Sequence, residues 1–224
     1  MLFIFMVNFD KMIDNYVYKE NKPPSIGRYW PSQIGSCIRK VWYSYKHPKE
    51  IDTELQKIFE LGNIMHNFVV DVLKSEKNPH VELVNCELPL KLEKDGFTVS
   101  GRVDDIILLK EDGKYVIVEV KSHKNIAYVD EPSRAHIVQI MIYMHVSGIH
   151  NGIILYIDKN NLKTKFFEVE YDEEFAKKII DRIKKLDKFL KENKLPPAEA
   201  KYDKKLRWMC KFCEYRERCE KDEK

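Results

Sequence analysis

The sequence predicts an α/β fold in which helices flank one mixed central sheet. Strand-like patterns are concentrated in the middle of the chain, and helix-period patterns precede and follow them. The resulting order is helices, a β-meander, a helix, two strands and a helix, which differs from the regular alternation of a doubly wound fold. With 224 residues, 44% of them hydrophobic, the chain can bury a core without disulfides, and we expect a single domain over residues 1–224.

Two helices are expected in the N-terminal third, after an irregular arm at residues 21–31. Ser32 is a good N-cap for a helix that reaches about Lys46. Asp52 is an N-cap for a second helix that reaches about Ser75. One face of this second helix carries residues at helical spacing, which are Leu55, Phe59, Gly62, His66, Val69 and Leu73.

Strand patterns fill residues 80–121 and are divided by two glycine-containing turns, Lys94-Asp95-Gly96 and Glu111-Asp112-Gly113. A helix follows, which Pro132 can start at its first turn and which Gly148 can end.

The C-terminal third is expected to complete the sheet and to add one more helix. Two strands are predicted at residues 153–158 and 164–170, and an amphipathic helix at 172–193. The sequence Leu195-Pro196-Pro197 then separates this helix from a cysteine-rich tail.

Charge and hydropathy exclude some classes of protein. The formal net charge of +3 neither requires nor excludes nucleic acid, because a basic groove can lie on a nearly neutral molecule. The apolar opening at residues 1–7 is shorter than the roughly 20 residues that span a bilayer, and it lacks the features of a secretory signal. We therefore expect a soluble, cytoplasmic protein that does not associate with a membrane.

Charged residues interrupt two strands that otherwise look buried. Residues 115–121 are apolar on both alternating faces, except that Glu119 and Lys121 share one face. Asp104 and Asp105 interrupt the preceding strand in the same way. Because an unpaired carboxylate in a covered strand costs on the order of several kcal/mol, these residues need a partner.

A divalent cation is one such partner. If the two strands pair antiparallel, Asp104 and Glu119 can converge on one ion, and magnesium favours a few carboxylates with water and phosphate oxygens. An ion there polarises a phosphate and activates a water, while Lys121 orients that water or neutralises developing charge. The alternative is a buried ion pair between Glu119 and Lys121, or a strand end that reaches solvent.

Three further polar residues lie on predicted helices. His66 is either a hydrogen-bonded core histidine or a third metal ligand. Gln139 and Tyr143 are one turn apart and share a face of an otherwise apolar helix. These two residues either bond into the core or touch the substrate backbone and the catalytic residues.

The tail carries three cysteines, Cys210, Cys213 and Cys219, in a short, loop-rich segment that is an expected place for thiolate ligands. Cys86 lies in a strand pattern, where a small buried thiol is the ordinary expectation. Cys37, near the start of a helix, is the better fourth ligand. Four thiolates suit zinc and an iron–sulfur cluster equally, and such a site would join the two ends of the chain and stabilise the fold.

Read in chain order, these motifs resemble one family. They are Cys37, Gly62-x3-His66, Gly101-Arg-Val-Asp104, Glu119-Val-Lys121, Gln139-x3-Tyr143 and Cys210-x2-Cys213-x5-Cys219. Over about residues 30–220 the sequence resembles the CRISPR-associated RecB-like exonucleases, the Cas-four family, within the PD-(D/E)XK nuclease superfamily. Gly-Arg-Val-Asp stands where a Pro-Asp pair precedes the acidic cluster in other branches of the superfamily.

The resemblance implies a restriction-endonuclease-like, RecB-like fold with a 4Fe-4S cluster. The cluster would be held by residues 30–47 and 200–220, through Cys37, Cys210, Cys213 and Cys219. The implied activity is that of a magnesium- or manganese-dependent exonuclease that cuts single-stranded DNA ends, from 5′ to 3′. Its implied role is to process spacer precursors alongside the CRISPR integrase complex.

The resemblance also implies roles for individual residues. The metal ligands would be His66, Asp104, Glu119 and the main-chain carbonyl of Val120. The catalytic residues would be Asp104, Glu119 and Lys121. Gln139 and Tyr143 would lie near the DNA. No role for Cys86 follows from the resemblance.

Other functions remain open at the level of sequence. A nuclease of the same fold that acts in repair or in a mobile element carries the same four-cysteine plan. A non-catalytic DNA-binding or assembly module, with a structural cluster, is a second alternative. A zinc-stabilised interaction domain is a third, but it leaves Asp104 and Glu119 unexplained.

DNA contacts are expected from local patches. Basic residues near the cysteines either hold phosphates or form a solvated surface; they are Lys201, Lys204, Lys205, Arg207 and Lys211. Tyr29, Trp30 and Trp208 either stack on unpaired bases or shield the metal centre.

Overall fold

A mixed six-stranded sheet forms the centre of the protein, as the sequence predicts. The computed structural model describes residues 7–223, so all but one residue of the apolar opening at 1–7 lie outside the described part. The strands are β1 (Arg28–Tyr29), β2 (Val81–Lys94), β3 (Phe97–Leu109), β4 (Lys114–His123), β5 (Asn151–Asp158) and β6 (Thr164–Glu170). Strands β2, β3 and β4 form the predicted antiparallel meander, β5 pairs parallel to β4, and β6 returns antiparallel to β5.

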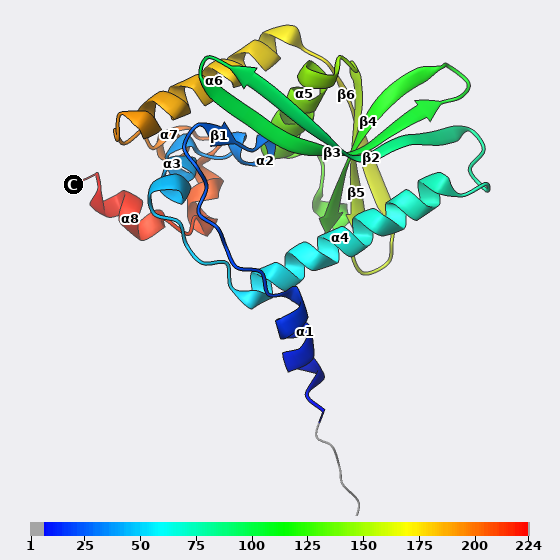
Figure 1. The fold of residues 1–224 in the computed structure, drawn as a ribbon, viewed down its shortest axis with the longest axis horizontal. Coiled ribbons are helices and arrows are strands. Elements are labelled where there is room, and N and C mark those ends of the chain that lie inside the picture. Colours follow the sequence, from blue (N-terminus) through cyan, green and yellow to red (C-terminus); the bar gives the residue numbers. More distant parts are fainter. Residues whose placement is uncertain (1–6, 224) are drawn as a thin grey trace, which may run out of the picture.

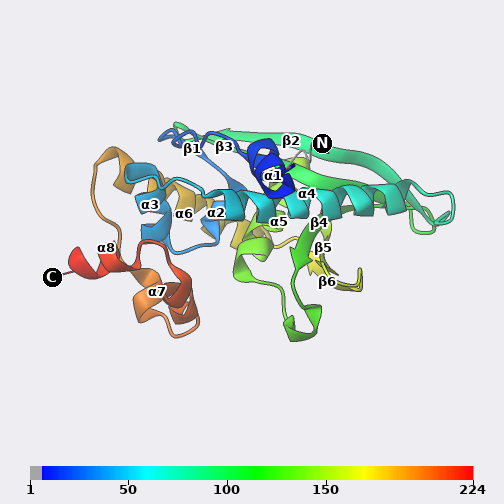
Figure 2. The ribbon, with the colours of Figure 1, turned by 90° about the horizontal axis from the view of Figure 1, so that it is seen from below.

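Helices lie on both sides of this sheet (Figures 1 and 2). The longer ones are α1 (Phe9–Val17), α3 (Ile38–Lys46), α4 (Thr53–Lys74), α5 (Arg134–Ser147) and α6 (Glu173–Lys191). The short ones are α2 (Pro31–Ile34), α7 (Glu199–Tyr202) and α8 (Arg216–Lys221), with 3₁₀ turns η1 (Ile126–Tyr128) and η2 (Arg207–Phe212). Within residues 7–223, no helix has both the length and the apolar character needed to cross a membrane.

Two apolar clusters show how α4 and α5 cover opposite faces. On one face Ile140 and Met144 of α5 pack with Ile117 and Ile154 of the sheet. On the other face Val69 of α4 packs with a cluster that includes Val116, Val118, Val120 and Ile157. Burial on both faces explains why the β4 sequence is almost continuously apolar.

The predicted caps start the long helices. The Asp52 side chain accepts a hydrogen bond of 2.8 Å from the amide of Leu55, and Asp172 accepts one of 2.9 Å from Phe175. Helix α5 is capped by Ser133, one residue after the predicted Pro132, and ends at Gly148 with φ of 73°. These local signals set the boundaries because they satisfy backbone groups that the helix itself leaves free.

The helix predicted from Ser32 to Lys46 is wrong as a single element, because it is broken into α2 and α3. The break begins at Gly35, where helix α2 meets the start of α5. A Cβ atom at Gly35 would lie 2.4 Å from Cα of Ala135, so only glycine permits this approach.

The apolar stripe predicted along α4 is only partly buried. Leu55 and Phe59 are 40% and 53% exposed, whereas Val69 and Val70 are buried. Helix α1, which the sequence analysis does not predict, packs against α4 and pairs Asp14 with Lys57 at 2.6 Å. Figure 1 shows α1 projecting away from the sheet below α4.

The C-terminal tail folds back beside α3, so that these two segments, far apart in the sequence, lie side by side (Figures 1 and 2). Arg182 of α6 holds this junction by donating to the main-chain carbonyls of Ile34 and Ser36 and to the Glu199 carboxylate. Glu199 in turn accepts a hydrogen bond of 2.7 Å from the amide of Ile38. This network fixes the start of α3, and therefore Cys37, against the tail.

Candidate active site

The candidate site lies where strand β3 changes its neighbour. One edge of β3 pairs with β1 at Thr98 and Val99, and with β4 from Asp105 to Leu109. Between these segments, no strand of the described chain pairs with that edge. Asp104 occupies the end of this gap, and its Oδ2 accepts a hydrogen bond of 2.9 Å from the amide of Val120.

The antiparallel pairing expected of β3 and β4 is confirmed. Because Asp105 pairs with Val118, the same register places Asp104 opposite Glu119. Glu119 has no exposed surface, and its negatively charged form is further disfavoured by Asp104. Burial and then this charge raise the pKa of Glu119 to about 8, although Lys121 acts in the opposite direction.

Lys121 is the nearest cation to Glu119. Its Nζ lies 2.6 Å from Glu119 Oε1, so the ion pair considered from the sequence is present. Burial opposes the lysine charge, but Glu119 and Asp104 together hold the pKa of Lys121 above its ordinary value. Glu119 Oε2 has no hydrogen-bond partner within the described chain. One lysine therefore leaves half of this buried carboxylate unsatisfied.

These residues fit a divalent cation in their chemistry. Glu119, fully buried with an orphaned oxygen, and Asp104, partly buried, form an acceptor-rich site beside Val120. Among residues 7–223, however, no three histidine, cysteine or acidic side chains converge as a ready-made metal group. Water and phosphate oxygens would have to supply the remaining ligands, as magnesium usually requires.

His66 lies against Asp105 rather than in a group with Asp104 and Glu119. Its Nε2 is 3.2 Å from Asp105 Oδ2, and this hydrogen bond raises the pKa of His66 despite the opposing effect of burial. Asp105 is fully buried and its Oδ1 has no partner in the described part of the chain. No role for Asp105 was predicted from the sequence. The signal for one is the pair of adjacent aspartates in an otherwise apolar strand.

A change of phase in β3 separates the two aspartates. Val103 belongs to the cluster under α5, whereas Ile107 belongs to the cluster under α4. In a regular strand these residues, four apart, would point to the same face. Asp104 and Asp105 lie within this change, so Asp105 meets His66 of α4 while Asp104 turns toward β4.

Gln139 and Tyr143 of α5 lie on the Glu119 side of the sheet. Gln139 Nε2 donates to Tyr143 Oη at 3.2 Å, and both residues are buried. Burial, and then the charge of Glu119, raise the pKa of Tyr143 above its ordinary value. A Cβ atom at Gly101 would lie 2.9 Å from the Tyr143 ring, so this glycine makes room for the tyrosine beside the gap in β3.

All four cysteines of the predicted set line one cavity of about 500 Å³, between α3 and the tail. They are Cys37, Cys210, Cys213 and Cys219, all present as free thiols. Burial raises the pKa of Cys210 and Cys213, and the nearby Cys37 raises both further. Their shared cavity fits a group bound by four thiolates, although the thiols do not converge as a metal group in the described chain.

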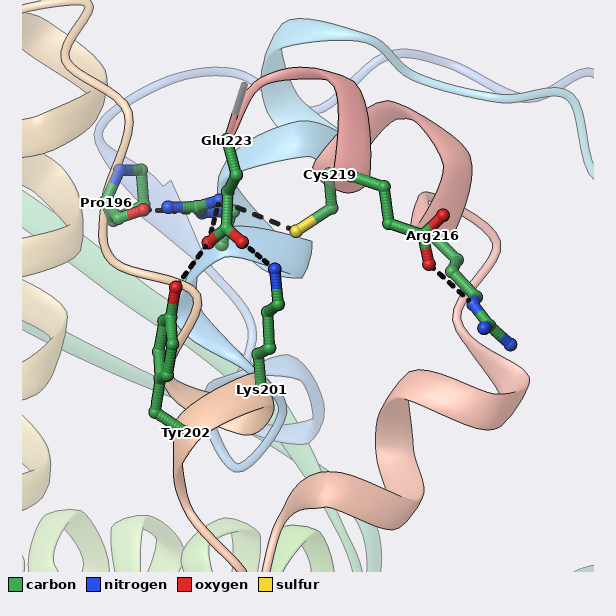
Figure 3. Close-up of polar contacts among 8 residues, drawn as sticks. Pro196, Lys201, Tyr202, Arg216, Cys219 and Glu223 are labelled. Atoms are coloured by element: carbon green, nitrogen blue, oxygen red, sulfur yellow. Dashed lines mark hydrogen bonds and ion pairs between the residues drawn. The ribbon is translucent and has the colours of Figure 1, made fainter.

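Arg39 lines this cavity, and Figure 3 shows three residues that it contacts, Pro196, Cys219 and Glu223. Its guanidinium group donates to the carbonyl of Pro196 at 2.7 Å, to Cys219 Sγ at 3.5 Å and to Glu223 at 3.0 Å. The positive charge of Arg39 therefore lies beside the cysteine cavity. The prediction that Cys86 is buried is wrong: it is exposed on β2, where residues 84–87 are all exposed beside a register shift in the pairing with β3.

The expected DNA-contacting patch is present in part. Lys201 pairs with Glu223, whereas Lys204, Lys205, Arg207 and Lys211 form no ion pair within residues 7–223. Tyr29 cannot stack on bases, because it is fully buried and donates its hydroxyl to Asp187 at 2.7 Å. Trp208 is 54% exposed, and it lines the cysteine cavity.

Comparison with known proteins agrees with this geometry. A family model described as the PD-(D/E)XK nuclease superfamily matches residues 31–220. The crystal structure of SSO0001 superposes with a TM-score of 0.60 at 18% identity, covering 94% of this chain and 95% of that one.

A second similar structure is an alkaline exonuclease from Laribacter hongkongensis, LHK-Exo, which has also been solved in complex with dAMP. Its TM-score is 0.54 at 12% identity, over 75% of this chain and 90% of that one. At such identities the likeness concerns the fold. A comparison with curated proteins gave no match.

Proposed function

The chain belongs to the PD-(D/E)XK nuclease superfamily, and we propose that it is a metal-dependent exonuclease that cuts single-stranded DNA ends. The observation that carries this proposal is Glu119, a fully buried carboxylate with an orphaned oxygen, opposite Asp104 and two residues from Lys121. A structural ion pair alone leaves that oxygen without a partner. The exonuclease LHK-Exo, whose fold is similar, binds a mononucleotide, which supports a nucleotide-cleaving role.

In the proposed mechanism, Asp104, Glu119 and the carbonyl of Val120 would hold magnesium or manganese, and His66, which contacts Asp105, would be a further ligand. When bound, this ion supplies Lewis-acid activation of the phosphodiester and of a water. Lys121 holds the attacking water or stabilises charge on the phosphate, because its buried ammonium group is charged and directed at the carboxylates. Gln139 and Tyr143 contact the DNA backbone from α5.

The four cysteines are proposed to hold a 4Fe-4S cluster that ties α3 to the tail. Their common cavity and the guanidinium of Arg39 support a cluster of thiolates, and the same thiols would also bind zinc. Metal analysis of protein purified anaerobically separates the two, since iron and sulfide in equal amounts support the cluster. Zinc without iron contradicts it.

The biological setting is proposed from the motif order, which resembles the Cas-four family. In that setting the protein acts in the cytoplasm, cleaves 5′ to 3′ and trims spacer precursors with the CRISPR integrase complex. A RecB-like nuclease of repair or of a mobile element is the alternative within the same fold. A non-catalytic DNA-binding module is the alternative from another class, but it gives no reason for Glu119 and Lys121 to be buried together.

The decisive experiment is digestion of 5′- and 3′-labelled single-stranded DNA with manganese. We expect the wild type to degrade the DNA and Glu119→Gln to lose at least about 100-fold in rate, since removing a charge-stabilising group commonly costs 10²–10³ in kcat. Glu168→Gln, on the exposed side of β6, is the matched control and should cut like the wild type. Equal cleavage by Glu119→Gln would remove Glu119 from the mechanism, and the two labels report polarity.

A further inference from the structure

A second cavity, of about 790 Å³, lies between the start of α5 and the tail segment that precedes Cys210. We call it the tail groove. Residues from three segments line it: Tyr156 of β5; Ser133, Arg134 and His136 at the start of α5; and Lys205 and Trp208 of the tail. Trp208 and Met209 also line the cysteine cavity, so these two residues border both cavities.

The floor of the tail groove adjoins the candidate active site. Tyr156 pairs in register with Lys121 on neighbouring parallel strands, so both side chains stand on the same face of the sheet. The Tyr156 hydroxyl accepts a hydrogen bond of 3.1 Å from the Ser133 amide and hydrogen-bonds His136 Nδ1 at 2.7 Å. Burial, and then the Lys121 charge, lower the pKa of His136 to about 3, so this imidazole is neutral.

The walls of the tail groove carry free positive charge. Arg134 and Lys205 have no ion-pair partner in the part of the chain that the structure describes. Two acids also line the groove, but the Asp203 carboxylate is engaged by the amide of Lys205 at 2.8 Å, and Glu131 is exposed. The first turn of α5 adds the positive end of its helix dipole. Arg134, Lys205 and the start of α5 are therefore the groups in the groove that suit phosphates.

Two exposed aromatic rings make the groove suitable for stacking unpaired bases. Trp208 is 54% exposed and Tyr128 is 82% exposed, and both line the groove. Aromatic side chains of this kind stack on bases in single strands, whereas the faces of bases inside a duplex are covered by their neighbours. Aromatic rings beside unpaired cations favour single-stranded over double-stranded nucleic acid.

We propose that the tail groove seats the single-stranded DNA chain next to Lys121, with a base stacked on Trp208 and phosphates held by Lys205 and Arg134. This inference rests on the proposed nuclease function and adds the path of the strand. It also makes the tail, and not only the sheet, a part of the substrate site.

The test is the affinity for fluorescein-labelled oligothymidylate, measured by anisotropy in EDTA so that cleavage cannot occur. We expect Trp208→Ala to bind roughly tenfold more weakly, the loss typical of one base stack, and Trp208→Phe to restore most of the affinity. For Lys205→Ala, the slope of log K against log salt should fall by about 0.7, since one phosphate contact is lost. Phe166→Ala and Lys77→Ala, an exposed aromatic and an exposed lysine elsewhere, are controls that should bind like the wild type.

Two outcomes would overturn the groove assignment. One is wild-type affinity and salt slope in both Trp208→Ala and Lys205→Ala. The other is an equal loss of affinity for a blunt-ended DNA duplex, which would show that unpaired bases are not what Trp208 recognises. Because Trp208 also borders the cysteines, the metal content of each variant must equal that of the wild type, and Lys205→Ala tests the groove without touching that cavity.

This design keeps the groove and the nuclease function separable. If the groove variants bind weakly while wild type and Glu119→Gln cut equally, the proposed catalytic site fails and the groove stands. If Glu119→Gln loses cleavage while the groove variants bind and cut normally, the nuclease stands and the groove fails.

Discussion

The raised pKa of the Glu119 carboxyl follows from its position in the fold. A carboxyl that is buried on a central strand resists ionisation, and here the charge of Asp104 adds to that resistance. The fold therefore tolerates the anion only where positive charge is supplied. Lys121 supplies one such charge from the same strand, and a divalent cation would supply the second.

This residue predicts how stability varies with pH when no metal is bound. The pKa of Glu119 rises from 4.5 to about 8 on folding, so the folded state binds this proton more tightly than the unfolded state. Stability contributed by the protonated form is complete below about 4.5 and is lost as the pH rises toward 8. Thermal melts in EDTA should show this loss for the wild type.

Glu119→Gln is the matched variant for this measurement, because glutamine keeps the shape and cannot ionise. Its melting temperature should vary less between pH 5 and 8, and manganese should raise the melting temperature of the wild type only. Identical pH profiles for the two proteins would show that Glu119 ionises freely in the folded state.

The main features of the site were predictable from the sequence, but the pairing of His66 with Asp105 was not. Asp104, Glu119 and Lys121 stand out because charge in a covered strand is expensive, and that pattern is visible in sequence. The pairing of His66 with Asp105 depends on the change of phase between Val103 and Ile107. Side-chain alternation alone cannot reveal such a change, because it assumes an unbroken period of two.

At the scale of elements, α2 and α5 approach each other closely at Gly35. A Cβ atom there would collide with main-chain atoms of Ala135, which cannot move as a flexible side chain can. The sequence gives no sign of this contact, since a lone glycine inside a helical pattern is compatible with a continuous helix. The long helices, by contrast, were predictable because their caps are local.

Gly35→Ala should therefore destabilise the protein by at least about 2 kcal/mol, as overpacking against a rigid neighbour does. Gly62→Ala is the control in helix α4, where the nearest atom to the new Cβ is Ser122 Oγ at 3.7 Å. It should be neutral or stabilise by up to about 1 kcal/mol, because alanine favours a helix interior. Urea unfolding of both variants measures the difference, and equal stabilities would mean that α2 can shift away from α5.

At the scale of the whole molecule, the cysteine cavity joins segments from the two ends of the chain. Arg182, Glu199 and Arg39 already hold these segments together through hydrogen bonds to main-chain groups and side chains. A bound metal centre would add a covalent link across a loop of more than 170 residues, which restricts the unfolded chain. Loss of that link should affect the stability of the whole protein.

Cys37→Ser and Cys213→Ser should each lose most of the bound metal and lower the melting temperature by several degrees, since about 1–3 kcal/mol of metal-linked stability is removed. Cys86→Ser is the control, because Cys86 is exposed and lies outside the cavity. Metal content and thermal melts of the three variants check this. Unchanged metal content in Cys37→Ser would exclude it as a ligand and leave the tail cysteines to bind by themselves.

The contact between α3 and the tail also sets an order of events during synthesis. Arg39 and Cys219, which are in contact, are separated by 180 positions, and a ribosome that adds about 5–20 residues per second needs roughly 10 to 40 s to make that length. Until Cys210 is made, Cys37 has none of its three tail partners. A metal shared by all four thiols can be inserted only after Cys219 is made, and a chain that stops before Cys210 has the residues of the candidate active site but only one of the four cysteines.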